Sequence, residues 1–170
     1  EIFRQAQQSL IVMNAHRVNR GELPELKTVT SDFFFMRRNS EESVTQLIRD
    51  LCTTRLPQRM GIQSSDIQVL SPTRKGGTAL NKLLQASLNP PAPQKKEKAY
   101  GEIAFREGDR VMQIRNNYDI MWKKCDGGAA GAGIFNGDVG VIREIDLQQE
   151  FLTVQFDDKE ADYDFTQLGE

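Results

Sequence analysis

The stretch that decides the fold is Ile67-Gln-Val-Leu-Ser-Pro-Thr-Arg-Lys-Gly-Gly77, followed by a leucine-rich segment that ends at Asn89-Pro90. Its first four residues are a mostly apolar run typical of a buried strand. Pro72 and Gly76-Gly77 then favour a tight turn. Thr78 is the expected N-cap of a helix, because the leucines after it repeat at helical spacing. The stretch therefore predicts a strand, a basic loop and a helix.

The basic loop has two interpretations. Many α/β proteins bind anions where a strand feeds a loop at the N-terminus of a helix. The alternative is an ordinary surface loop whose Arg74 and Lys75 are only solvated. From this stretch alone, the surface loop is the preferred interpretation.

Composition sets the outer limits of the interpretation. A chain of 170 residues with 38% apolar and 27% charged residues suits one or two small globular domains. The formal net charge of −2 gives no overall basic signature for nucleic acid, although a local basic face could still bind it. One histidine and two distant cysteines argue against a metal site and favour a reduced, cytoplasmic protein. No run is apolar enough to cross a membrane, and no signal peptide is visible.

The first half of the sequence predicts alternating helices and strands. A helix is expected over residues 2–18, ending at Asn19-Arg20-Gly21. Residues 28–36 predict a strand buried on both faces, since three adjacent phenylalanines cannot share one side. A second helix follows a cap at Asn39 or Ser40, and Cys52 lies on its apolar face as a packing residue. The order β-α-β-α favours a parallel sheet of a doubly wound α/β domain.

Two strands are too few for a stable sheet, so further strands are expected elsewhere in a longer parent chain. The absence of a methionine at Glu1 also makes the sequence look like an excerpt. Residues 90–98 are rich in proline and then basic, which indicates a linker and a domain boundary.

After the linker, short β segments alternate with turn signals. Two of them, 139–145 and 151–156, resemble the hairpin of a small SH3-like barrel, and the other two segments are 100–105 and 110–115. The glycine- and alanine-rich residues 127–133 predict a flexible loop. They do not form a phosphate-binding loop, because no Lys-Ser/Thr pair follows and no helix is expected after them.

Three groups of motifs occur in order along the chain. They are Phe3-Arg4-Gln5-Ala6 with Asn14-Ala15-His16, then Leu70 to Gly76 with Leu80 to Gln85 and Leu88-Asn89-Pro90, and finally Gly108 to Gln113, Asn116 to Asp119 and Phe135 to Gly140. Their order and spacing resemble the C-terminal motor region of RecD-like superfamily 1 ATP-dependent DNA helicases (exodeoxyribonuclease V alpha-chain-like), close to the stand-alone bacterial members. The resemblance covers nearly the whole chain.

The resemblance implies an α/β fold with three parts. Residues 1–93 would be the first part of the second RecA-like (P-loop NTPase-type) parallel-sheet domain, 94–99 a linker, and 100–166 an inserted SH3-like β-barrel. The parent would hydrolyse ATP with Mg²⁺ and move 5′ to 3′ on single-stranded DNA, in DNA repair and recombination. This sequence contains neither the phosphate loop nor the metal-holding acidic pair. The fragment alone is therefore expected to bind no cofactor and to be inactive.

The resemblance also implies site residues. Arg4 matches a catalytic arginine that reaches the ATP γ-phosphate, and Arg4 and Gln5 would contact the nucleotide. A guanidinium suits that role because it keeps its charge and presents a fixed fork of donors. The alternative is a surface arginine. The expected DNA contacts are Ser71, Thr73, Arg74 and Lys75 to the backbone, Asn117 as a polar donor and Tyr118 as a stacking ring.

Several alternatives stay open. Simple turn chemistry also accounts for Asn116 and Asn117. Trp122 suits the core as well as a stacking surface. The expected partners are single-stranded DNA and the remaining helicase domains of the same chain, with nuclease subunits unknown. A competing hypothesis is a non-enzymatic SH3-like module that binds protein or nucleic acid, and another is an unrelated α/β domain in which the match at Arg4 is coincidence.

Overall fold

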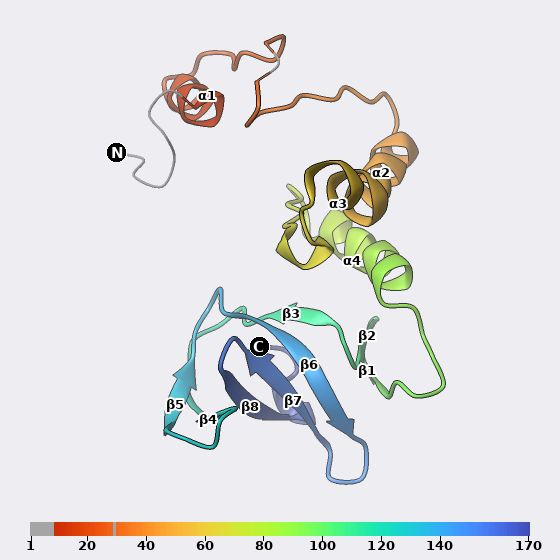
Figure 1. Ribbon diagram of the computed structural model, residues 1–170, viewed down its shortest axis with the longest axis vertical. Helices are drawn as coiled ribbons and strands as arrows, with labels where there is room; N and C mark the ends of the chain where they lie inside the picture. The colour runs from red at the N-terminus through yellow and green to blue at the C-terminus, as the bar shows by residue number, and fades with distance from the viewer. Residues whose placement is uncertain (1–8, 29) are drawn as a thin grey trace. The chain divides into compact units, whose positions relative to one another are not determined.

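The computed structural model describes residues 9–28 and 30–170. The chain forms two compact units, residues 1–44 and 45–170, and the boundary between them falls inside a helix. Figure 1 traces the helices of the first half and the strands of the second half. The two units are described separately below.

The first unit is built on helix α1 (Leu10–Asn19), which confirms the predicted helix from residue 10 onward. The predicted residues 2–8 lie outside the described part of the chain. Ser9 is the N-cap, and Gly21, at φ +76°, follows the helix end as expected. The buried Asn14 side chain donates to the Glu25 carbonyl oxygen at 3.0 Å and accepts from the Glu25 amide at 2.7 Å. This amide pair holds the chain against α1 after it reverses direction.

The predicted strand over residues 28–36 is wrong for the residues that the structure describes. The Thr30 hydroxyl accepts from the Phe33 amide at 3.2 Å and donates to the Asp32 carboxylate at 2.6 Å. Such local bonds favour a turn over an extended strand. Phe34 and Phe35 are about half exposed instead of buried on both faces. A strand also needs a neighbour, and none of the described segments pairs with this one.

A long helical segment follows. It consists of α2 (Glu41–Asp50), the π-helical turn η1 (Leu51–Arg55) and α3 (Leu56–Met60). The predicted helix through Cys52 is confirmed, but the exit loop expected from the sequence at residues 55–61 is wrong, because α3 occupies most of it. The Ser40 hydroxyl accepts from the Ser43 amide at 3.2 Å, as expected of a cap. Cys52 is 3% exposed, which confirms its packing role, and burial raises the pKa of its thiol.

The predicted strand at Ile67–Leu70 is also wrong. This segment follows a short 3-10 turn, η2 (Ser64–Asp66), and is irregular, with Leu70 86% exposed. Helix α4 (Arg74–Leu88) starts earlier than predicted because Thr73, not Thr78, caps it. Its end before Asn89 is confirmed. All strand pairs among the described residues are antiparallel, so the expected RecA-like parallel sheet is not present there.

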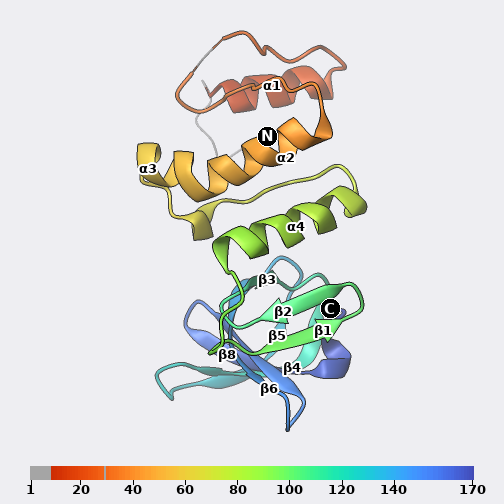
Figure 2. The same cartoon turned by 90° about the vertical axis from the view of Figure 1, so that its right-hand side faces the viewer.

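The rest of the chain is antiparallel β structure. A separate hairpin pairs β1 (Glu97–Tyr100) with β2 (Ile103–Arg106), so residues 97–99 of the expected linker lie in a strand (Figure 2). The main sheet has the order β3-β6-β7-β8-β4-β5. Its strands are β3 (Arg110–Met112), β4 (Asn117–Lys124), β5 (Ala130–Ile134), β6 (Val139–Asp146), β7 (Phe151–Phe156) and β8 (Lys159–Asp164), and a 3-10 turn, η3 (Phe165–Gln167), follows. The main sheet ends at β3 and β5, and no ladder of the described residues joins these strands into a closed barrel.

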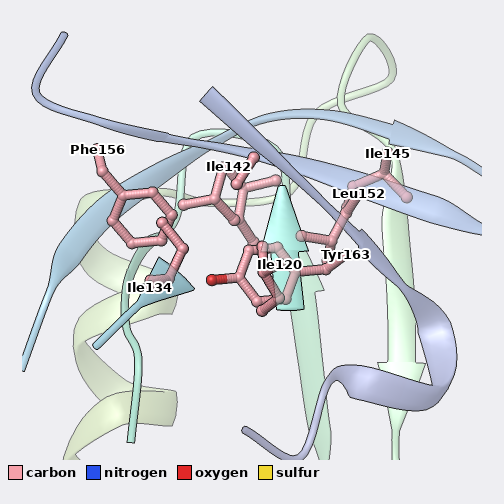
Figure 3. Packing of buried hydrophobic residues seen from close by; sticks show 9 residues of the cluster. Ile120, Ile134, Ile142, Ile145, Leu152, Phe156 and Tyr163 are labelled. Atoms are coloured by element: carbon pink, nitrogen blue, oxygen red, sulfur yellow. The ribbon is translucent and has the colours of Figure 1, made fainter. Parts of the chain in front are cut away.

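Strand β7 supplies part of the hydrophobic core of this sheet, because buried and partly exposed side chains alternate along it. Every second residue of β7 is buried, which places Leu152, Val154 and Phe156 on the inner face. Figure 3 shows these side chains gathering with those of the neighbouring strands. Gly140 lets β6 approach closely, because a Cβ there would lie 2.5 Å from Val154 Cγ1 and 2.6 Å from the Gln155 carbonyl oxygen. The full cluster is Ile120, Ile134, Ile142, Ile145, Leu152, Val154, Phe156, Ala161 and Tyr163.

Strands β4, β5 and β8 were not predicted. The expected flexible loop at 127–133 contains most of β5, which pairs with β4. A Cβ on Gly131 would lie 2.4 Å from the ring of Trp122, so the glycine makes room for the indole. Trp122 is partly buried and packs against the core cluster. The small residues that suggested a loop therefore serve as a packing surface.

Candidate nucleic-acid interface

Charge is unevenly distributed within the second unit. Residues 45–96, which include α4, carry eight basic and two acidic side chains. Residues 97–170, which form the sheets, carry eight basic and sixteen acidic side chains. The near-neutral total charge hides this difference. This charge distribution would attract a polyanion to the helical segment and repel it from the sheet segment.

The start of α4 brings together four of the residues expected to contact DNA. The Thr73 hydroxyl accepts from the Gly76 amide at 3.1 Å, and the Ser71 hydroxyl donates to the Thr73 carbonyl oxygen at 3.1 Å. These two bonds fix the turn that precedes the helix. They also engage both hydroxyl groups inside the protein, so Arg74 and Lys75 are the side chains left to reach outward.

Arg74 and Lys75 occupy an electrostatically unfavourable position. Both are exposed, and neither forms an ion pair within the described residues. The first turn of α4 contains no acidic residue. A cation at a helix N-terminus opposes the helix dipole, an effect of about 0.3–1 kcal/mol each, whereas an anion there is stabilised. A bound phosphate would offset this repulsion, because it would lie between the dipole and the two cations.

The other end of α4 is bonded to the β structure through the Asp109 cluster, defined as Gln85, Asn89, Arg106 and Asp109. The Asp109 carboxylate accepts from Gln85 Nε2 at 2.5 Å, Asn89 Nδ2 at 2.7 Å and the Arg106 amide at 2.8 Å. Arg106 and Asp109 are both buried. Among the described residues, these donors come from α4, from its C-cap Asn89 and from the last residue of β2.

Further bonds extend the contact between the helix end and the strands. Arg106, 7% exposed, forms an ion pair with Glu97 at 2.8 Å and donates to the Asn89 carbonyl oxygen at 2.5 Å. The Glu107 carboxylate accepts from the amides of Lys96 and Ile145, both at 3.0 Å. The end of α4, the segment after it and β6 are therefore held by one polar network.

The two expected contacts on β4 differ in their surroundings. Asn117 donates to the Glu170 carboxylate at 2.5 Å and accepts from the Asp119 amide at 2.9 Å, so its amide is engaged within the protein. Tyr118 is 67% exposed, and its ring meets that of Phe135 at a centroid distance of 5.6 Å and an angle of 72°. Of the two, Tyr118 is the side chain free to meet a ligand.

The expected nucleotide contacts, Arg4 and Gln5, lie outside the described residues. In residues 9–28 and 30–170, no group of three His, Cys, Asp or Glu side chains could hold a metal ion. The same part of the chain has no helix that combines the length and apolar character needed to span a membrane.

Sequence reasoning missed the Asp109 cluster and Phe135. Asn89, Asp109 and Phe135 lie inside the motifs quoted above, but the motifs were interpreted for ligand contacts and not for contacts with one another. Asn89 was noticed only as the end of a helix, and Asp109 only as part of a turn. A buried carboxylate with donors far apart in the chain leaves no local periodic signal.

Comparison with known families identifies part of the chain. Residues 80–156 match the family described as the ATP-dependent RecD-like DNA helicase SH3 domain. The matched segment starts inside α4 and ends with β7, so it includes both sides of the Asp109 cluster. No solved structure matches the chain. The family match supports an origin in a RecD-like helicase.

Proposed function

We propose that this chain is part of an ATP-dependent, superfamily 1 DNA helicase of the RecD-like kind and supplies part of its single-stranded DNA track. The match of residues 80–156 to the SH3 domain of such helicases is the observation that carries the assignment. The order of the motifs outside that segment adds the finer expectation, which is the C-terminal motor region.

The basic helical segment is the proposed DNA-binding part of the second unit. Arg74 and Lys75 lie at the start of α4, exposed and without ion-pair partners in the described chain. Their charges would meet phosphate oxygens, while the capped turn of Ser71 and Thr73 fixes their position. Tyr118 would stack on a base. Asn117 would support Tyr118 from the protein side, since its amide is already bonded.

The exposed apolar segments are proposed to become strands in the complete protein. Phe34, Phe35 and Leu70 expose at least half of their surface, although their sequences favour buried strands. In a RecA-like parallel sheet, the segments 28–36 and 67–70 would pair with strands from the rest of the chain. Amide hydrogen exchange tests this, because these amides should be protected in the complete protein and exchange rapidly in the 170-residue chain.

Arg4 and Gln5 are proposed to contact ATP across a cleft with another domain of the same chain, in a cytoplasmic enzyme that moves 5′ to 3′. ATP and Mg²⁺ would be held mainly by that other domain. Arg4→Ala in the complete protein should lower kcat by roughly 10³-fold or more with little change in nucleotide Kd. An unchanged kcat would remove Arg4 from the proposed site without affecting the DNA track.

Single-stranded DNA binding tests the proposed track directly. Arg74→Ala in the complete protein should weaken binding and reduce the slope of log K against log salt by about 0.7, the value for one phosphate contact on a single strand. Arg143→Ala is the matched control, because Arg143 is also exposed but lies on β6 in the acidic segment. Equal slopes in the wild type and both variants would contradict the track at α4.

The second candidate function is a non-enzymatic SH3-like module that binds protein or nucleic acid. The acidic sheet segment favours it, because sixteen acidic side chains would suit a basic protein partner. The complete protein separates the two proposals. The helicase hydrolyses ATP faster when single-stranded DNA is added, and a binding module does not hydrolyse ATP.

A further inference from the structure

An exposed pair of aromatic rings stands at one end of the main sheet. Tyr118, at the start of β4, is 67% exposed, and Phe135, just after β5, is 42% exposed. The rings meet edge to face at 72°. Two rings at this angle form a corner with open aromatic surface, and exposed apolar surface of this kind commonly marks a binding site.

The protein backbone holds this corner in place. A Cβ on Gly133, at φ +100°, would lie 3.0 Å from Phe135 Cζ, so the ring of Phe135 rests on a glycine of β5. The amide of Phe135 donates to the Asp138 carboxylate at 2.9 Å. The segment before β4 and the turn after β5 are also joined, because the Asn136 amide donates to the Asn116 side chain and the Gly137 amide to the Gln113 carbonyl oxygen, both at 2.9 Å.

One unpaired cation lies beside the corner in the sequence. Arg115, three residues before Tyr118, is exposed and has no ion-pair partner in the described part of the chain. It lies in a segment with twice as many acidic as basic side chains. Aromatic rings with a neighbouring guanidinium are the combination that binds unpaired bases and the phosphates between them.

We propose that Tyr118 and Phe135 form a stacking corner for one unpaired base of a DNA strand, with Arg115 contacting a phosphate next to that base. This inference rests on the proposed function and adds two residues to its DNA track, Phe135 and Arg115. Tyr118 offers the open ring face, and Phe135 is the positioning residue that holds it. A duplex is excluded, because the faces of paired bases are covered by their neighbours.

The acidic side chains around the rings limit how much of a DNA strand can contact the sheet. Asp119 and Asp138 lie near the rings in sequence, so phosphates are repelled from most of the sheet. A strand would therefore touch the sheet through a base and one adjacent phosphate, and it would not lie along the sheet. The stacking contact should depend little on salt, unlike the contacts at α4.

Photo-crosslinking tests this contact in the complete protein. A single-stranded oligonucleotide that carries 5-iododeoxyuridine crosslinks to aromatic side chains on which the iodinated base stacks, and mass spectrometry identifies the residue. The proposal predicts crosslinks at Tyr118 or Phe135. If the oligonucleotide binds but crosslinks only elsewhere, the stacking corner is wrong and the proposed function stands. If no single-stranded DNA binds, both proposals fail.

Matched variants separate stacking from folding. Tyr118→Ala should weaken single-strand binding by roughly tenfold, and Tyr118→Phe should restore it, because one stacked base contributes on that scale. Phe135→Ala should lower the crosslinking yield at Tyr118 while the thermal unfolding midpoint stays close to that of Tyr100→Ala, a control at an exposed aromatic of β1. Unchanged binding in Tyr118→Ala, with normal unfolding, would overturn the proposal.

Discussion

Asp109 shows how one side chain can connect two elements that are distant in sequence. Its buried carboxylate accepts hydrogen bonds from Gln85 of α4, from Asn89 just after α4 and from the amide of Arg106, the last residue of β2. A carboxylate in such surroundings is stabilised only while its donors are present. The residue therefore contributes to folding, and it lies inside one of the motifs that carry the family resemblance.

Asp109→Ala should destabilise the protein by about 2–4 kcal/mol, because it leaves the donors of Gln85 and Asn89 without their acceptor in a partly buried site. Urea unfolding measures the loss. Asp119→Ala is the matched control, since Asp119 is exposed and its carboxylate accepts no hydrogen bond from the described residues. A loss at Asp109 no greater than that at Asp119 would show that the cluster does not hold α4 to the sheet.

Tyr163 makes stability depend on pH in the alkaline range. Burial raises the pKa of its phenol, and the charges of Glu170 and Asp138 raise it further. The unfolded chain then loses this proton first, above about pH 10, so the contribution is fully present below that pH and is lost as the pH rises toward the folded-state pKa. The slope approaches about 1.4 kcal/mol per pH unit.

Tyr163→Phe should therefore flatten the fall of unfolding free energy above about pH 10, as measured by urea unfolding at a series of pH values. The variant also loses the hydrogen bond from the phenol to Gln113, so it should be less stable than the wild type near neutral pH. Tyr118→Phe is the comparison at an exposed ring. If the wild type and Tyr163→Phe have the same alkaline slope, the buried phenol is not the cause.

At the scale of elements, α4 illustrates what sequence can and cannot supply. Its leucine spacing and its end before Asn89 were predictable, because helical periodicity and proline signals are local. Its start was misplaced at Thr78, since both Thr73 and Thr78 are possible caps and only the observed bond to the Gly76 amide distinguishes them. The two neighbouring glycines at the start give a direct test of this cap.

Gly77→Ala should stabilise the protein by roughly 0.5–1 kcal/mol, because alanine is the better helix former and the nearest atom to a new Cβ is 4.0 Å away. Gly76→Ala should lose this gain, since its Cβ would lie 2.6 Å from Ser71 Oγ and 3.0 Å from Thr73 Oγ1. Thermal unfolding of both variants measures the difference. An equal gain at both positions would contradict the cap at Thr73.

The β strands also differ in whether a local sequence pattern predicts them. Strand β7 was predicted with its observed bounds because apolar and polar side chains alternate along it. Strand β5 was missed because Gly131 accommodates the Trp122 ring, and a packing surface made of glycine has no hydrophobic signal. The predicted strands at 28–36 and 67–70 are absent from the residues that the structure describes, because strand propensity needs a partner strand to hydrogen-bond.

At the scale of the whole molecule, the opposite charges of residues 45–96 and 97–170 are the feature that we expect to affect the proposed DNA binding most. This asymmetry was visible in the sequence but was hidden by the near-neutral total. The residues proposed for ATP, Arg4 and Gln5, depended on a family resemblance alone. The DNA contacts depended on it as well, and the structure adds the geometry of α4 and of the ring pair.

Removing acidic charge from the sheet should strengthen DNA binding only at low salt. Glu144→Gln with Glu150→Gln, both exposed, should raise single-strand affinity modestly at 0.01 M salt, where the Debye length is about 30 Å, and not at 0.15 M, where it is about 8 Å. Fluorescence anisotropy at both salt concentrations measures this. Gln148→Glu with Gln149→Glu should have the opposite effect. A gain that persists at 0.15 M would indicate direct contact between DNA and this face.

The measurement that tests the central proposal most directly is ATP hydrolysis by the complete protein with and without single-stranded DNA, in the wild type and in Arg74→Ala. The account predicts turnover that rises when DNA is added. In Arg74→Ala it predicts the same maximal turnover, reached only at higher DNA concentration, because the variant loses a phosphate contact. Absence of ATP hydrolysis under both conditions would contradict the helicase assignment. If DNA stimulates both proteins identically, the helicase assignment stands, but the proposed DNA contact at the start of α4 is wrong.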